Sequence, residues 1–310
     1  MVNSVLGEIN SKDLGITLMH EHIASINSSM HHTFPDWFNR KETISKAVKQ
    51  LKQAKQYGLK TIVDATPINL GRDIHLLKEI AEKTQIQIIP STGFYYTEEP
   101  FLSGWKIEHL VQLLFSEVEN GIQGTDIVPG VIKCATKAEI TETNEKLLRT
   151  AARLHVKSGL PVITHSSSID KNGLVQQKIL LEEEVNPDKL VIGHCGDTDD
   201  IPYLEALLEH ECYIGLDRFG LDAILPMDRR IDVCADLCER GYEKQIVVSH
   251  DYNVFIDWWP PDVLPYIRSS NPRWSFHHIF VDIIPKLIEK GVSQRQIDTM
   301  TIENPMKIFK

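Results

Sequence analysis

The stretch Ile16-Thr17-Leu18-Met19-His20-Glu21-His22 joins an apolar run to a His-x-His pair. Alternate residues of a β-strand point to the same side. Two imidazoles two positions apart can therefore bind one metal ion from a single strand end. Further candidate metal ligands follow apolar runs of their own along the chain, namely Lys133, His165, His194 and Asp251.

Short runs rich in Val and Ile alternate with helical segments throughout the chain. Runs of about five to eight such residues are typical of strands buried on both faces. Strands are predicted over Ile16–His20, Lys60–Ala65, Ile86–Ser91, Ile127–Cys134, Pro161–His165, Leu190–His194, Cys212–Asp217 and Gln245–Asp251. Eight strands alternating with about eight helices predict an α/β fold, a (β/α)8 TIM barrel that forms one domain over residues 1–310.

Helices are predicted where apolar residues recur at helical spacing between these strands. The first covers Glu42–Tyr57 and ends at Gly58. Others are predicted over Arg72–Lys83, Lys106–Glu119, Glu142–Lys157, Leu174–Glu184, Ile201–Glu211, Asp228–Glu239 and Trp274–Lys290. A final helix opens at Ser293, where Gln296 completes a capping-box pattern.

Composition narrows the class of protein. The 310 residues suffice for a barrel of about 250 residues, and 42% hydrophobic with 25% charged residues is ordinary for a soluble protein. The net charge of −10 argues against nucleic-acid binding. The sequence has no membrane-length apolar stretch and no signal-peptide pattern. Five cysteines without a CxxC pair indicate free thiols and a cytoplasmic location, and Cys234 and Cys238 are expected in the core.

Active sites of such barrels lie at the carboxyl ends of the strands. Six candidate metal ligands occupy that position in the prediction, His20 and His22 on the first strand, Lys133 on the fourth, His165 on the fifth, His194 on the sixth and Asp251 on the eighth. The second, third and seventh strands supply none. This joint pattern favours a metal site over isolated loop histidines.

Lys133 is the unusual member of the set, because it follows Val131-Ile132 inside an apolar strand. A buried ammonium ion is costly unless it is paired or neutralised. One interpretation is an ion pair or a side chain that reaches the barrel mouth. The other is a carbamate, formed with carbon dioxide, that bridges two metal ions about 3.5–4 Å apart, which share a nucleophilic hydroxide. The whole ligand set suits divalent zinc, iron, cobalt or manganese.

Ten segments carry a resemblance to a known family: Leu18–His22, Thr61–Thr66, Gly71–Asp73, Gly121–Thr125, Gly130–Ala135, Ile163–Ser166, Ile192–Asp199, Ile214–Gly220, Val248–Asp251 and Ile302–Pro305. In them the chain resembles the phosphotriesterase family of the amidohydrolase superfamily, and within it the phosphotriesterase-like lactonases. The segments span nearly the whole chain.

The resemblance implies a binuclear centre and distributes the ligands. His20, His22 and Asp251 fall on the more buried metal, His165 and His194 on the more exposed metal, and N6-carboxylated Lys133 bridges the two together with a hydroxide. Asp251 is then placed to receive the hydroxide's proton. Asp197 matches a carboxylate that helps to carry the proton away, although a turn or helix-cap role stays open for it.

Three further residues bear on the substrate. Arg218 stands where dedicated phosphotriesterases of the family carry histidine and the lactonases carry arginine. Tyr95 matches a lactonase tyrosine that orients the lactone ring or helps the leaving alkoxide. Trp258 falls in the loop that shapes an apolar channel for an acyl chain. Simple packing is the alternative interpretation for both aromatic residues.

The resemblance therefore implies a lactonase acting on N-acyl-homoserine lactones, hence a quorum-quenching enzyme, or on other γ- and δ-lactones. Promiscuous organophosphate triesterase activity is expected beside it, and the family's lactonases suggest a homodimer. A dedicated phosphotriesterase (aryldialkylphosphatase) and an N-acyl amide hydrolase remain as alternatives. A barrel that only binds small molecules is disfavoured, because none of the six candidate ligands is missing.

Overall fold

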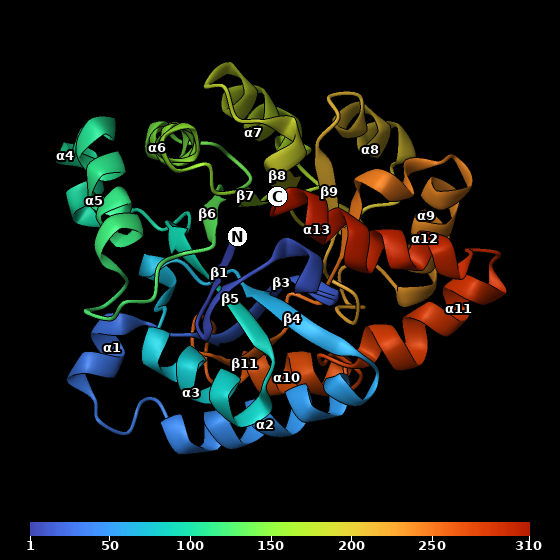
Figure 1. The fold of residues 1–310 in the computed structure, drawn as a ribbon, viewed down its shortest axis with the longest axis horizontal. Coiled ribbons are helices and arrows are strands. Elements are labelled where there is room, and N and C mark those ends of the chain that lie inside the picture. Colours follow the sequence, from blue (N-terminus) through green and yellow to red (C-terminus); the bar gives the residue numbers. More distant parts are fainter.

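The computed structural model describes residues 1–310 and contains a curled nine-stranded parallel sheet surrounded by helices, as Figure 1 shows. The hydrogen-bonded order is β10-β9-β8-β7-β6-β5-β4-β3-β11. Neighbours along the chain are thus neighbours in the sheet, which is the topology of the predicted (β/α)8 barrel.

The strands of the barrel lie close to the predicted ranges. They are β3 (Ile16–Ser25), β4 (Leu59–Asp64), β5 (Gln87–Gly93), β6 (Val131–Ala135), β7 (Val162–His165), β8 (Leu190–Ile192), β9 (Tyr213–Leu216), β10 (Ile246–Val248) and β11 (Asn253–Ile256). A separate antiparallel hairpin, β1 (Val2–Ser4) with β2 (Gly7–Ile9), precedes them and was not predicted.

The helices are α1 (Ser28–Thr33), α2 (Arg40–Gln56), α3 (Ile74–Thr84), α4 (Pro100–Gly104), α5 (Ile107–Asn120), α6 (Glu142–Ser158), α7 (Asn172–Glu182), α8 (Ile201–Leu208), α9 (Met227–Glu239), α10 (Val263–Ser270), α11 (Ile284–Glu289), α12 (Gln294–Asp298) and α13 (Asn304–Ile308). Single π-helical turns, Ile279–Ile283 and Thr299–Glu303, precede α11 and α13.

The barrel interior is filled below the candidate site. Each of the strands β3 to β10 sends one apolar side chain inward, and together they form a buried cluster: Met19, Val63, Ile89, Val131, Ile163, Val191, Tyr213 and Val247. Val2, Leu14, Ile308 and Phe309 join the same cluster. Both chain ends accordingly lie near the middle of the ring in Figure 1. The floor under the site is therefore solid and apolar.

The eighth strand is interrupted where the ring closes. The prediction gave one strand over Gln245–Asp251, whereas β10 pairs with β9 and the separate β11 pairs with β3. Asp251 lies in the break and has a left-handed φ of 52°. Its N–H donates to His20 O at 3.0 Å, so a backbone hydrogen bond connects the break to β3.

Other differences are local. β3 runs on to Ser25, so that His20 and His22 lie within the strand and not at its end. The predicted helix Trp274–Lys290 becomes helical only at Ile279. The capping box of Ser293 and Gln296 is confirmed. All cysteines are free and buried, and no helix is both long and apolar enough to cross a membrane.

Candidate metal centre

The six candidate ligands converge at the carboxyl end of the barrel. His20 Nε2 lies 2.6 Å from Lys133 Nζ and 3.8 Å from Asp251 Oδ1. His22 Nε2 lies 3.1 Å from the same carboxylate oxygen. Ligand atoms of His20, His22 and Asp251 therefore all lie within 4.8 Å of one another, close enough to hold one metal ion.

The other two histidines meet near the second carboxylate oxygen of Asp251. His194 Nε2 lies 2.8 Å from His165 Nδ1 and 3.8 Å from Asp251 Oδ2. Two neutral imidazole nitrogens at this distance must share a proton or bind a common cation, because two lone pairs would repel. The donor set is thus chemically suited to a second cation, with Asp251 facing both groups.

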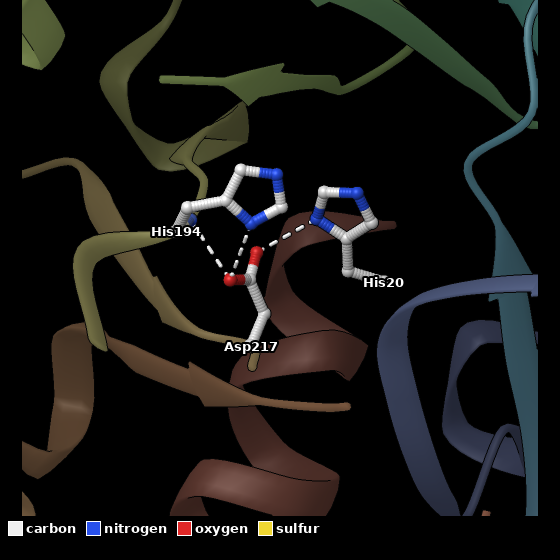
Figure 2. A group of neighbouring side chains, drawn as sticks. All are labelled: His20, His194 and Asp217. Atoms are coloured by element: carbon white, nitrogen blue, oxygen red, sulfur yellow. Dashed lines mark hydrogen bonds and ion pairs between the residues drawn. The ribbon is translucent and has the colours of Figure 1, made fainter. Parts of the chain in front are cut away.

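Asp217 holds the imidazole rings of His20 and His194 through their Nδ1 atoms. Its carboxylate accepts from His20 Nδ1 at 2.7 Å and from His194 Nδ1 at 3.0 Å, as drawn in Figure 2. Each histidine then keeps the Nε2 lone pair for the space shared with Asp251. Burial disfavours the ionised form of Asp217, but the imidazoles of His194 and His20 outweigh it and hold its pKa well below the ordinary value.

Asp217 was not predicted as a site residue, and β9 was expected to contribute no ligand. It touches the Nδ1 atoms and not the ligand side of either ring, so its role is orientation. Its position at the carboxyl end of β9, two residues after Gly215, was the available signal. A Cβ at Gly215 would lie 2.7 Å from Asp217 Oδ2, which explains the glycine.

Two more polar side chains orient the ligands. Thr66 Oγ1 lies 2.8 Å from His22 Nδ1. Glu21, between the two histidines of β3, accepts from Ser249 Oγ, from His250 N and Nδ1, and from Tyr252 N. This buried carboxylate therefore ties the His-x-His strand to the segment that carries Asp251.

Two candidate ligands have unusual backbone conformations. His194 has φ 61° and Asp251 has φ 52°, both in the left-handed region that residues other than glycine rarely adopt. Such conformations persist where the surrounding structure enforces them, and they concentrate at functional sites.

Lys133 is 1% exposed, and its inward direction follows from strand alternation with Val131. Burial lowers the pKa of its amine to about 8. Burial and the Lys133 amine likewise lower the pKa of His20 to about 3, so its imidazole is neutral at physiological pH. Burial also lowers the pKa of His165 well below the ordinary value. Neutral imidazoles are the form that binds metals.

Arg218 lies beside the same carboxylate. Its Nε donates to Asp251 Oδ2 at 2.8 Å, and its Nη1 donates to Asp197 Oδ2 at 2.7 Å. Burial disfavours ionised Asp251, but Arg218 and the imidazoles outweigh it and keep the pKa of Asp251 well below the ordinary value. Asp197 contacts Arg218 and not Asp251, so its proton-carrying role stays a prediction.

A cavity of about 420 Å³ opens over the centre. His22, Lys133, His165 and Asp251 form its floor. Tyr95, Arg218 and Trp258, the residues predicted to bind substrate, all line it. The Tyr95 ring packs edge-on against His165 at 5.1 Å and against Trp258 at 5.7 Å between centroids.

Comparison with known proteins agrees with this geometry. Residues 1–309 match the model of the phosphotriesterase family. The chain belongs to that family. It is 40% identical over 97% of its length to an aryldialkylphosphatase of Saccharolobus solfataricus, covering 96% of that protein. A phosphotriesterase homology protein of Mycobacterium tuberculosis is 37% identical over the whole chain, covering 97% of that protein.

A solved structure supports the same assignment. The phosphotriesterase from Mycobacterium tuberculosis superposes with a TM-score of 0.92 at 36% identity, covering 100% of this chain and 98% of that one. More distant relatives include an N-acetyltaurine hydrolase of Danio rerio, 26% identical over 99% of this chain and 97% of that protein. This member of the amidohydrolase superfamily is therefore a hydrolase of the metal-dependent phosphotriesterase family.

Proposed function

We propose that this phosphotriesterase-family hydrolase is a lactonase that opens N-acyl-homoserine lactones or other γ- and δ-lactones, with weaker organophosphate triesterase activity. The observation that carries the proposal is Arg218, which bonds to Asp251 inside a cavity that is polar at its floor and apolar on its walls. A lactone with an acyl tail has the same division into one polar reacting end and one apolar end.

The proposed centre holds two divalent cations. His20, His22 and Asp251 would bind one, His165 and His194 the other, and Lys133, carboxylated on its amine, would lie between them. The chemistry of the donors supports this, since four imidazoles and a carboxylate gather within a few ångströms of one another at the base of the cavity. The cations would activate water as a nucleophile at neutral pH and polarise the carbonyl oxygen.

Lys133 is suited to carboxylation because its amine is buried and its pKa is lowered to about 8. A sizeable neutral fraction then exists near neutral pH. The neutral amine forms an N–C bond to carbon dioxide and releases one proton. The product is an anionic oxygen ligand in place of a buried cation, which removes the cost of an isolated ammonium ion.

The chain's other residues divide the remaining work. Asp251 is the proposed proton acceptor during attack, because its carboxylate faces both histidine groups. Arg218 keeps that carboxylate oriented and ionised. Tyr95 stands over His165 at the cavity floor, where its hydroxyl can hold the lactone oxygen and give a proton to the leaving alkoxide.

The upper cavity favours an apolar tail. Leu221, Ile224, Ile256, Trp258 and Ile267 contribute to its lining. Burial of a methylene group is worth about 0.8 kcal/mol, so an acyl chain of several carbons gains substantial affinity there. Diethyl phosphotriesters leave most of this surface unused.

The test is steady-state kinetics on protein reconstituted with zinc, cobalt, manganese or iron. A panel of γ- and δ-lactones with varied acyl tails is compared with paraoxon. We expect lactone kcat/KM to exceed paraoxon kcat/KM by several orders of magnitude. Rapid paraoxon turnover with inert lactones would instead favour a dedicated phosphotriesterase.

A second candidate function is hydrolysis of N-acyl amides. It is favoured by the relatives named N-acetyltaurine hydrolase, which are 26–27% identical over nearly the whole chain. Turnover of short N-acyl amino sulfonates or amino acids, with lactones and paraoxon both inert and two metals bound, would establish it. We also expect a homodimer, which light scattering on the purified protein checks.

A further inference from the structure

Arg230 on α9 is a fully buried arginine that the proposed chemistry does not use. It is 2% exposed and belongs to the bulkiest side chains removed from water in this protein. A guanidinium ion is costly to bury unless its N–H groups are bonded. Its partners therefore indicate what it stabilises.

These partners lie on two loops of the site. In the loop after β8, Arg230 Nη1 donates to Gly196 O at 2.5 Å and Nη2 pairs with Asp197 Oδ1 at 2.9 Å. In the loop after β9, Nε donates to Leu225 O at 2.9 Å and Nη2 donates to Leu221 O at 3.0 Å. One side chain thus clamps both loops to α9.

The clamped loop after β9 is one wall of the cavity. Arg218, Leu221, Ala223 and Ile224 all come from it. Local backbone hydrogen bonds run from Leu221 N to Arg218 O and from Ile224 N to Leu221 O, both at 3.2 Å. Two longer-range bonds also hold the loop, since Phe219 N donates to Ser249 O at 3.3 Å and Asp222 N donates to Asn271 Oδ1 at 2.7 Å. Arg230 is the buried side chain that ties this turn to α9, through Leu221 O and Leu225 O.

Asp197 connects the clamp to the centre. Its Oδ1 faces Arg230 and its Oδ2 faces Arg218, whose Nε reaches Asp251. A guanidinium offers only N–H donors and keeps its proton at any physiological pH. Arg230, Asp197, Arg218 and Asp251 therefore form a row of alternating charges, in which the position of each side chain depends on its neighbour.

We propose that Arg230 is a positioning residue of the hydrolytic site, which sets the place of Arg218 and of the cavity wall that follows it. The inference rests on the proposed function only in that Arg218 acts on Asp251 or on the substrate. Displacement of a reacting group by about 1 Å can cost about 100-fold in rate, so a remote clamp can control activity.

The first experiment measures hydrogen–deuterium exchange in the resting protein without substrate. Arg230→Lys keeps the charge but cannot span both loops, and we expect amides of residues 220–225 to exchange at least about tenfold faster. Arg229→Lys is the matched control, since Arg229 is the exposed neighbour on α9 and pairs with Asp199 on the surface. Unchanged exchange in Arg230→Lys overturns the inference.

The second experiment is a double-mutant cycle with Arg218→Met. We expect Arg230→Lys to lower kcat/KM by about 10- to 100-fold in the wild-type background and by less than about threefold in the Arg218→Met background, because Arg230 acts through Arg218. Equal losses in both backgrounds overturn the inference, since they indicate a general structural role.

Asp197→Asn keeps the test falsifiable if Arg230→Lys does not fold. It removes the charge between the two guanidinium groups without changing the size of the side chain, and the same accelerated exchange and the same non-additivity with Arg218→Met are expected. A wild-type protein that opens no lactone refutes the proposed function. The exchange experiment still decides the role of Arg230, because it needs no turnover.

Discussion

Asp217→Asn provides the sharpest test of how the candidate ligands are oriented. The aspartate accepts hydrogen bonds from the Nδ1 atoms of His20 and His194 and from His194 N at 2.8 Å. Asparagine has one accepting oxygen and one NH₂ group, so at least one imidazole must face a donor. That ring then accepts at Nδ1 and carries its proton on Nε2, where a metal ligand needs a lone pair.

The expected magnitude follows from this count. Loss of an orienting partner costs about 10–100-fold in metal affinity, which corresponds to about 1.4–2.7 kcal/mol. One carboxylate serves a histidine in each of the two proposed ligand groups. We therefore expect both metal equivalents to be weakened, the one bound by the misoriented ring most strongly.

The assay is competition for zinc with a chromogenic chelator, followed by metal analysis of the dialysed protein. Asp199→Asn is the control, because Asp199 is a half-exposed aspartate that pairs only with Arg229 on the surface. We expect it to bind zinc as the wild type does. Wild-type stoichiometry and affinity in Asp217→Asn would refute the reasoning, since the imidazoles would then be oriented by other groups.

Three further predictions concern single side chains. The buried Lys133 amine has a pKa of about 8, against an ordinary value of 10.5. Between pH 8 and pH 10.5 the folded state therefore binds fewer protons than the unfolded state. The free energy of unfolding of the wild type should rise by about 3 kcal/mol over this pH range. Lys133→Met should therefore be about 3 kcal/mol more stable than the wild type at pH 7 in metal-free, carbon-dioxide-free buffer. This difference in stability should close as the pH rises from about 8 to about 10. Urea unfolding measures the difference, and a value that does not change with pH would contradict the prediction. Tyr95→Phe should lower kcat for lactones by about 100-fold through loss of the proton donor but slow paraoxon much less, because nitrophenolate leaves without a proton; stopped assays on both substrates measure the ratio. Trp258→Ala should reduce the preference for long over short acyl lactones by about tenfold in kcat/KM, and an unchanged preference would show that the tail lies elsewhere.

The alternation of apolar runs was enough to predict the barrel, because strands buried on both faces have few alternatives in sequence. β3 and the eighth strand were predicted less well. Glu21 and Asp251 interrupt the apolar pattern there, and only the closed ring shows that Glu21 binds the backbone around Asp251. The hairpin β1–β2 has strands of three residues, too short for a recognisable alternation.

The candidate ligands could be predicted because each follows an apolar run, a local signal. Asp217 and Arg230 could not, since their importance lies in partners far along the chain, such as His20 for Asp217 and Gly196 for Arg230. An isolated aspartate after a strand or an arginine on a helix is common in any sequence. Tertiary contacts alone distinguish these two from surface charges.

The break in the eighth strand has a consequence for how this protein can diversify. Asp251 is secured on both sides, by β10 on β9 before it and by β11 on β3 after it. The loop that carries Trp258 and Trp259 begins only after this second anchorage. Insertions and substitutions in residues 258–262 can therefore reshape the mouth of the barrel while the Asp251 carboxylate stays in register. In natural evolution and in laboratory libraries alike, changes in this segment can alter the range of substrates without disturbing the candidate metal ligands.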